Sequence, residues 1–151
     1  MSSVVSIGSN VGDRLAHLRI AVAALEPAHV SSVWRTEPVG GVPQSAFLNA
    51  VLLCPGDAGA TWAAAQQAEA QAGRTREVRW GPRRLDVDLI VASGAVPDGL
   101  VLPHPRAHER AFVLAPWLEV QPDAQLPQGS VAALLDLLGA EGVTCTGLAL
   151  R

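Results

Sequence analysis

Apolar and polar positions in the first quarter of the chain predict a short strand followed by a helix. Val4–Ile7 is a continuous β-type run that ends at a glycine. After a turn rich in Gly and Asn, apolar residues recur three or four positions apart between residues 15 and 25, which is the spacing of one helix face. Asp13 is a suitable N-cap for this helix, and Pro27 ends it.

Strand and helix patterns continue to alternate up to residue 91. Val30–Thr36 has β character, and after a loop rich in Pro and Gly the next apolar run is Phe47–Leu53. An alanine-rich helix is expected to begin after Thr61 and to run to Ala72, because Ala is the strongest helix former. Leu85–Val91 is the last strand of this part. The order is therefore β-α-β-β-α-β.

The C-terminal third adds further segments to this core. Ala111–Val120 is helical in pattern but is expected to be interrupted at Pro116. Ser130 is a suitable N-cap for a last helix whose apolar face is formed by Val131, Leu134, Leu135 and Leu138. We therefore predict an α+β fold with a ferredoxin-like βαββαβ core, an antiparallel sheet with helices on one face, and extra C-terminal strands and helices. No linker divides the chain, so residues 1–151 are expected to form a single domain.

The composition narrows the class of protein. Of the 151 residues 49% are apolar and 17% charged, a balance that favours a folded domain over disorder. The net charge of −3 gives no general attraction to nucleic acid or to an anionic membrane. The sequence shows no signal segment and no apolar run near the ~18 residues of a membrane span. We expect a cytoplasmic monomer with no nucleic-acid or membrane partner and with two free thiols, Cys54 and Cys145.

Basic charge is concentrated in one segment. All 11 basic residues are arginine, and five of them, Arg74, Arg76, Arg79, Arg83 and Arg84, fall close together. The absence of lysine excludes a Walker A phosphate loop, which requires a Lys after its glycines. Arginine forks match phosphate oxygens with paired hydrogen bonds. The segment is a candidate phosphate-binding region, although clustered charge alone is also typical of a solvated loop.

An Asp-x-Asp pair, Asp86 and Asp88, follows the arginine-rich segment directly. Side chains alternate faces along a strand, so the intervening apolar residues should pack on the helices while both aspartates point the other way, about 7 Å apart. Two carboxylates on one face repel each other unless a cation lies between them, and Mg²⁺ is commonly held by one or two carboxylates together with substrate phosphate oxygens. An ordinary exposed strand face is the alternative, but Asp is depleted in strands. The pair and the arginines together indicate a site for a metal–polyphosphate complex.

Six sequence blocks carry a resemblance to a known family. In chain order they are Gly8-Ser9-Asn10-x-Gly12-Asp13-Arg14, Arg35-Thr36-x-Pro38-x-Gly40, Phe47-Leu48-Asn49, Gly73-Arg74-x-Arg76, Arg79-Trp80-Gly81-Pro82-Arg83-x-Leu85-Asp86-x-Asp88, and Pro103-His104-Pro105-Arg106-x-His108-x-Arg110-x-Phe112. Together they resemble the 6-hydroxymethyl-7,8-dihydropterin pyrophosphokinase family over roughly residues 4 to 122. The resemblance implies a ferredoxin-like α+β fold. It also implies an ATP-dependent enzyme of folate biosynthesis that moves the β,γ-pyrophosphoryl unit of ATP to the hydroxymethyl oxygen of the pterin and releases AMP.

The resemblance further implies residues for ATP and metal. By position, Asp86 and Asp88 match the ligands of two Mg²⁺ ions around the triphosphate, and with Arg74 and Arg83 they match the catalytic set. The positions that match contacts to ATP are Gln66, Glu69, Arg74, Arg76, Trp80, Arg83, Leu89, His104 and Arg110.

A pterin pocket is implied in the same way. Phe47 and Phe112 match the two aromatic residues that sandwich the pterin ring, and Asn49 matches the side chain that hydrogen-bonds its polar edge. From the residues alone, both phenylalanines would be read as ordinary core. The full implied set is Thr36, Glu37, Val39, Phe47, Asn49 and Phe112, with Glu37 and Val39 acting through their backbone. His17 and His29 match no such role and are expected at the surface.

Two other functions stay open. A Gly-Ser pair with a later Asp-x-Asp also suggests an Mg-dependent nucleotidyltransferase, but there the acidic pair follows closely, and here nearly eighty residues intervene. Release of pyrophosphate in place of AMP would mark that activity. A non-catalytic ferredoxin-like binding module for RNA or regulation would need aromatic residues on the sheet and a basic surface, whereas Tyr is absent and the net charge is negative.

Overall fold

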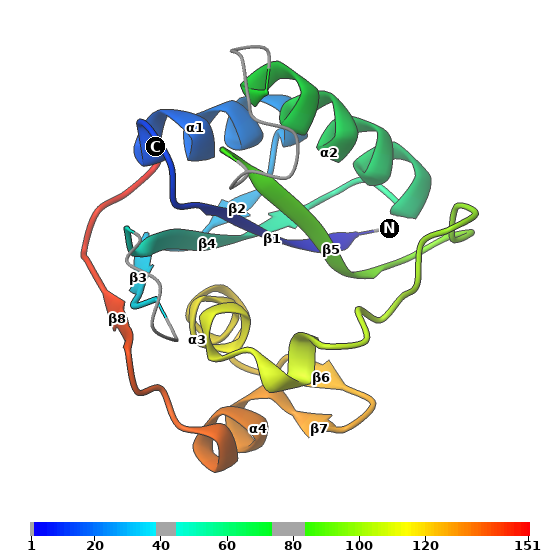
Figure 1. The fold of residues 1–151 in the computed structure, drawn as a ribbon. Helices are drawn as coiled ribbons and strands as arrows, with labels where there is room; N and C mark the ends of the chain where they lie inside the picture. Colours follow the sequence, from blue (N-terminus) through cyan, green and yellow to red (C-terminus); the bar gives the residue numbers. More distant parts are fainter. Residues whose placement is uncertain (1, 39–44, 74–83) are drawn as a thin grey trace.

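The first 92 residues follow the predicted β-α-β-β-α-β order except that the second strand is divided in two, and most of the remaining residues add a layer below the sheet (Figure 1). This computed structural model describes residues 2–38, 45–73 and 84–151. Within these ranges the elements are β1 (Ser3–Ser9), α1 (Arg14–Leu25), β2 (His29–Val30), β3 (Trp34–Thr36), β4 (Phe47–Cys54), α2 (Ala58–Ala72), β5 (Asp86–Ala92), η1 (Ala107–Glu109), α3 (Ala111–Val120), β6 (Gln125–Leu126), β7 (Gly129–Ser130), α4 (Val131–Leu138) and β8 (Val143–Cys145).

The main sheet of the described chain has the strand order β5-β1-β4-β3-β8, and β2 pairs with the far end of β4. Every pairing in it is antiparallel. Strand β1 lies between β4 and β5, so Gly8 lies opposite Asn49 of β4 on one side and opposite Asp86 of β5 on the other. This is the ferredoxin-like order with β8 added at the β3 edge, so the predicted α+β fold is confirmed.

Helices cover both faces of the sheet, but unequally. On the first face, alternate residues of β1, β4 and β5 pack against α1 and α2 in one apolar core that includes Val5, Leu52 and Leu89. On the second face, α3 packs through Val113 and Trp117 on a smaller set of strand residues. Figure 1 shows α1 and α2 above the sheet and α3 below it, backed by α4 and the β6–β7 hairpin. Helices α3 and α4 and the β6–β7 hairpin therefore form the third layer, whereas β8 joins the sheet.

Two predicted helix starts are confirmed by their capping hydrogen bonds. Asp13 Oδ1 accepts a hydrogen bond from Ala16 N at 3.1 Å, and Ser130 Oγ accepts one from Ala133 N at 3.1 Å. Each bond satisfies one of the backbone donors that the first turn leaves without a helical partner. Helix α1 then ends before Pro27, with Glu26 in the left-handed conformation at φ 46°.

Two predicted boundaries were wrong because polar side chains changed the local backbone. Helix α2 begins at Ala58 rather than after Thr61, since Asp57 Oδ1 accepts a hydrogen bond from Ala60 N and caps the helix one turn earlier. The single strand predicted over Val30–Thr36 is two short strands. Between them Ser31 Oγ accepts a hydrogen bond from Val51 N at 2.9 Å, so this N–H bonds to a side chain instead of a backbone carbonyl, while Ser31 N still donates to Val51 O at 3.0 Å.

Two expectations for the C-terminal helices also need correction. Helix α3 runs through Pro116 without a break; proline removes one backbone hydrogen bond, and the buried packing of this helix offsets that loss. The predicted apolar face of α4 holds for Val131, Leu134 and Leu135, but Leu138 is 46% exposed because the helix ends there. No helix within the described ranges is long and apolar enough to cross a membrane.

Candidate active site

The second face of the sheet is apolar at one end and polar at the other. Val51 and Ile90 lie under α3, whereas the positions farther along the same face are Ser6, Gly8 and Asn49. Asp86 and Asp88 continue this polar end on β5, opposite Gly8 and Ser6. Because α3 stops short of these residues, a cavity of about 340 Å³ remains over them.

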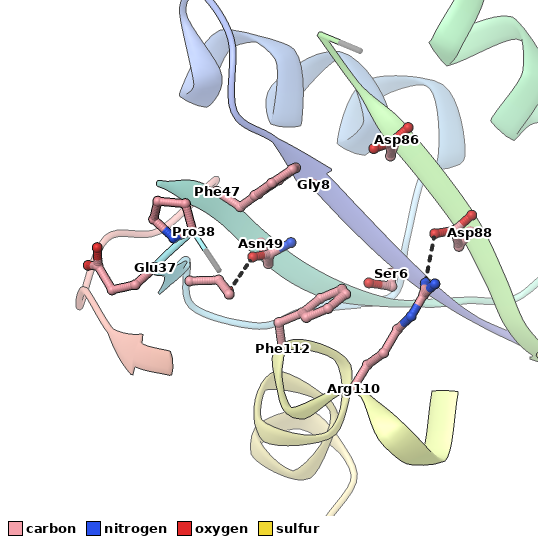
Figure 2. Close-up of a pocket in the computed structure, with 11 residues that line it drawn as sticks. Ser6, Gly8, Glu37, Pro38, Phe47, Asn49, Asp86, Asp88, Arg110 and Phe112 are labelled. Atoms are coloured by element: carbon pink, nitrogen blue, oxygen red, sulfur yellow. Dashed lines mark hydrogen bonds and ion pairs between the residues drawn. The ribbon is translucent and has the colours of Figure 1, made fainter. Parts of the chain in front are cut away.

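The cavity collects most of the predicted site residues in the described chain (Figure 2). Its lining consists of Ser6, Gly8, Thr36, Glu37, Pro38, Phe47, Asn49, Asp86, Asp88, Arg110 and Phe112. The predicted metal pair and the predicted pterin residues are far apart in sequence. The sheet brings them to one opening because β4, β1 and β5 are neighbours.

Two aromatic rings stand at the side of the cavity away from the aspartates. Phe47 is the first residue of β4, and Phe112 lies in the first turn of α3. Both are partly exposed, which distinguishes them from the fully buried residues around them. Figure 2 shows Asn49 between the two rings, with its amide directed into the opening. Two rings at this position can bind a flat heterocycle between them.

The Asn49 side chain is held in one orientation by its neighbours. Thr36 Oγ1 donates a hydrogen bond to Asn49 Oδ1 at 2.7 Å, and Asn49 is only 3% exposed. A Cβ built on Gly8 would stand 2.7 Å from Asn49 Nδ2. Gly8 therefore leaves the space that this amide occupies. The amide nitrogen can donate to an acceptor on the edge of a ring bound beside it.

The two aspartates face the cavity as the strand alternation predicted. Val87 and Leu89, the residues that alternate with them, are 3% and 1% exposed on the opposite face. Arg110 Nη1 lies 3.9 Å from Asp88 Oδ2, and the Arg110 guanidinium carbon lies 5.7 Å from the centre of the Phe112 ring. Arg110 thus connects the carboxylate side of the cavity to the aromatic side.

Hard carboxylate oxygens are suitable ligands for Mg²⁺ when substrate oxygens complete the shell. Within the described ranges no group of three or more His, Cys, Asp and Glu side chains could hold a metal ion. The donor set at this cavity is therefore the two aspartates, which fits an ion that arrives with a phosphate ligand.

His104 lies beside the carboxylate side of the cavity. Its backbone N–H donates to Ile90 O at 2.8 Å, and its Nδ1 accepts a hydrogen bond from Arg106 N at 3.1 Å. The pKa of His104 is lowered, first by burial and then by the nearby Arg110 and Arg106, while Asp88 acts in the opposite direction. The ring is therefore held in its neutral form, with Nε2 carrying the proton.

The two predicted ATP residues on α2 lie along the outer side of β5. Glu69 Oε2 accepts a hydrogen bond from Val87 N at 3.0 Å, which joins α2 to this strand next to the aspartates. Gln66 is exposed one turn earlier on the same helix. Leu89, also predicted to contact ATP, has a buried side chain, so its contact with a ligand is restricted to its backbone.

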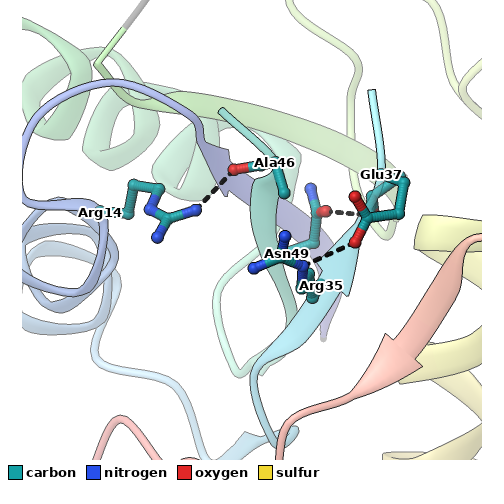
Figure 3. Close-up of polar contacts among 6 residues, drawn as sticks. Arg14, Arg35, Glu37, Ala46 and Asn49 are labelled. Atoms are coloured by element: carbon teal, nitrogen blue, oxygen red, sulfur yellow. Dashed lines mark hydrogen bonds and ion pairs between the residues drawn. The ribbon is translucent and has the colours of Figure 1, made fainter. Parts of the chain in front are cut away.

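The remaining predicted site residues divide into two groups. Glu37 lines the cavity, but its backbone N–H already donates a hydrogen bond to Gly142 O at 2.9 Å. Its carboxylate accepts a hydrogen bond from Arg35 Nε at 2.7 Å, which lowers the pKa of Glu37 (Figure 3). The second group lies outside the described residues: Val39, Arg74, Arg76, Trp80 and Arg83.

Three residues that line the cavity, Ser6, Gly8 and Pro38, were not among the predicted site residues. Ser6, a polar residue within the apolar run of β1, was a visible signal in the sequence. His17 was expected at the surface, and that prediction was wrong: it is 9% exposed, and its Nδ1 lies 3.2 Å from Ser9 Oγ. Residues eight positions apart meet here because the turn after β1 folds back on the first turn of α1.

Comparisons with known proteins agree with this geometry. The family model of 7,8-dihydro-6-hydroxymethylpterin-pyrophosphokinase matches residues 4–122. A 2-amino-4-hydroxy-6-hydroxymethyldihydropteridine pyrophosphokinase of Mycobacterium leprae is 48% identical over 98% of this chain and 90% of the relative. Proteins of the same name from Mycobacterium tuberculosis (48% identical, 82% of this chain and 74% of the relative) and Bacillus subtilis (42%, 77% and 75%) are also similar.

Proposed function

Because this chain belongs to the 7,8-dihydro-6-hydroxymethylpterin-pyrophosphokinase family, we propose that it transfers the pyrophosphoryl unit of ATP to 6-hydroxymethyl-7,8-dihydropterin and releases AMP, a step of folate biosynthesis. The observation that supports this most is the composition of one cavity. It combines two aromatic rings and an oriented amide on one side with two carboxylates and an arginine on the other. These are the groups needed for a flat heterocycle and for a metal-bound polyphosphate.

The pterin binds between Phe47 and Phe112, with its polar edge against Asn49. Stacking on the rings excludes water from both faces of the heterocycle, and the amide selects an edge that carries a matching acceptor and donor. Thr36 acts through Asn49, since its hydroxyl fixes which end of the amide faces the ligand. This arrangement directs the hydroxymethyl group towards the aspartates.

ATP lies along β5, where Asp86 and Asp88 would hold two Mg²⁺ ions that arrive with the triphosphate. The ions would neutralise phosphate charge and help to align the attacking and leaving oxygens. Arg110 and the Nε2–H of His104 lie on the same side and donate to phosphate oxygens. Arg74, Arg76, Trp80 and Arg83 belong to the proposed nucleotide site by sequence position, and Glu69 and Gln66 border it from α2.

The reaction joins the pterin oxygen to the β-phosphorus of ATP. The hydroxymethyl oxygen attacks in line, the bond between the β-phosphorus and the α–β bridging oxygen breaks, and AMP leaves with that oxygen. The proton of the hydroxymethyl group is released to solvent or to a nearby carboxylate. The protein positions the reacting groups and supplies positive charge, because phosphoryl-type transfer requires little covalent chemistry from side chains.

The identity of the nucleotide product tests this proposal. The protein is incubated with ATP, Mg²⁺ and 6-hydroxymethyl-7,8-dihydropterin, and the products are separated by anion-exchange chromatography. We expect AMP and pterin diphosphate in equal amounts. ADP as the product would indicate single phosphoryl transfer, and free pyrophosphate would indicate a nucleotidyltransferase; either outcome would refute the proposal.

A further inference from the structure

The turn between β1 and α1, together with the first residue of α1, contacts the residues that lead into β4 and β5, two of the strands that line the cavity. On one side, Arg14 Nη1 donates a hydrogen bond to Ala46 O at 2.7 Å (Figure 3). Ala46 is buried and directly precedes Phe47, the aromatic residue at the start of β4. A guanidinium bond to a carbonyl is charge-assisted, so it restrains this backbone more strongly than a neutral hydrogen bond.

On the other side, the same turn contacts the residues before β5. Gly12 has φ +69°, and a Cβ built on it would stand 3.0 Å from Arg84 Nη1 and 3.2 Å from His17 Cε1. The Arg84 guanidinium therefore packs against the bare Cα of Gly12. Arg84 precedes Asp86 by two residues, so a displacement of its side chain acts on the start of the strand that carries the carboxylates.

Internal hydrogen bonds hold this turn in one conformation. Ser9 Oγ and His17 Nδ1 are 3.2 Å apart in a buried pair that joins the end of β1 to α1. Asp13 caps the helix through Ala16 N, and its carbonyl accepts from His17 N at 3.0 Å. Because these hydrogen bonds fix both ends of the turn, the turn restrains the positions of the side chains and backbone groups that contact it.

We propose that the Gly12–Arg14 turn is a two-sided positioning element for the reaction. The hydrogen bond from Arg14 to Ala46 O fixes the backbone before Phe47 and so positions Phe47 on the pterin side. The contact of the Arg84 guanidinium with Gly12 fixes the backbone before Asp86 and so positions Asp86 on the nucleotide side. Neither residue touches a substrate. The inference rests on the proposed function, because it assigns the two sides of the cavity to the pterin and to the nucleotide.

The two halves of the turn have separate effects on the two ligands. Arg14→Met keeps the length of the side chain and removes its hydrogen bonds, so pterin affinity should fall about tenfold, while the affinity for a Mg²⁺-bound, non-hydrolysable ATP analogue stays within about twofold. Arg84→Met should show the reverse, with about fivefold weaker binding of the ATP analogue. Arg14→Lys keeps the charge without the fork, so its pterin affinity should lie between the wild type and Arg14→Met.

Isothermal titration calorimetry measures both affinities, with pterin titrated into protein saturated with the ATP analogue. Arg19→Met is the matched control, because Arg19 is an exposed arginine of the same helix; it should change neither affinity. Melting temperatures of all variants show that each one is folded. If Arg14→Met destabilises the fold, the pterin affinity of Arg14→Lys is used to test the effect on the pterin side.

The crossed pattern separates positioning from a general loss of structure. Unchanged pterin affinity in both Arg14 variants would overturn the inference, and so would equal weakening of both ligands in Arg14→Met and Arg84→Met. A wild-type protein that binds pterin poorly and releases no AMP would instead refute the proposed function itself, and the inference with it. That failure is visible before any variant is made.

Discussion

Gly8→Ala is the substitution whose effect the structure defines most closely. Gly8 lies in β1, between β4 and β5, and has no positive φ, so its backbone accepts alanine. The new Cβ would stand 2.7 Å from Asn49 Nδ2, against about 3.4 Å for ordinary contact, whereas the next nearest atoms are at 3.8 Å and 3.9 Å. The Asn49 amide must therefore move by about 0.7 Å, the difference between the first two distances.

This movement acts on the hydrogen bond that orients the amide. The bond from Thr36 Oγ1 to Asn49 Oδ1 is 2.7 Å long and part-buried, so displacing the amide strains or breaks it. Misplacing a buried hydrogen-bonding group costs about 1–3 kcal/mol, which corresponds to pterin binding weaker by about 5- to 150-fold. Stability should change less, because alanine restricts the unfolded chain and returns about 0.4–1 kcal/mol.

Calorimetric titration of pterin into the Gly8→Ala variant, with Mg²⁺ and a non-hydrolysable ATP analogue present, measures this loss. Thermal denaturation confirms that the variant is folded. The same substitution in an Asn49→Ala background is the control, since it has no amide to displace and should weaken binding no further. Wild-type pterin affinity in Gly8→Ala would refute the proposed role of Asn49 orientation, and an equal loss in the control background would refute the steric mechanism.

Three further predictions follow from the same structure. Asp86→Ala and Asp88→Ala should each abolish AMP release without lowering the melting temperature, because removing one of two facing carboxylates relieves repulsion; near-normal turnover at ordinary Mg²⁺ would contradict the metal assignment. A thiol reagent at about pH 8 should modify the exposed Cys145 but not the buried Cys54, whose pKa burial raises to about 11; rapid modification of both in the native protein would contradict this. Burial lowers the pKa of His104, so the unfolded chain takes up its proton first, and stability should fall as pH drops through about 6.5. His104→Gln should lose less stability over that range than the wild type, and identical pH profiles would show that His104 contributes nothing.

Sequence reasoning succeeded where a local rule decides the outcome. The alternation of a strand placed Asp86 and Asp88 on one face and Val87 on the other without any knowledge of the neighbouring strands. The N-caps Asp13 and Ser130 followed from side chains that bond to the backbone three residues on. These features depend on contacts within a few residues, so a single sequence contains the information that specifies them.

Features that depend on distant partners could not be predicted in this way. His17 is buried because Ser9 and the Arg84 side chain lie at the same turn. The spacing of apolar residues in the helix gives no sign of these contacts. The break at Ser31 arises from its bond to Val51, a residue on another strand. The cavity itself exists because α3 covers only part of a sheet face, which depends on how the third layer packs.

Nuclear magnetic resonance of ¹⁵N-labelled protein tests the central claim, that both substrates meet on the polar end of the second sheet face. Pterin added to protein saturated with Mg²⁺ and a non-hydrolysable ATP analogue should shift the Gly8 backbone amide, the Asn49 side-chain amide and the Phe112 backbone amide most strongly. Signals from α4 and from the β6–β7 hairpin, which lie on the side of α3 away from the sheet (Figure 1) and contribute no residue to the cavity lining, should stay unchanged. Pterin-induced shifts confined to those C-terminal elements, with Gly8 and Asn49 unaffected, would contradict the account.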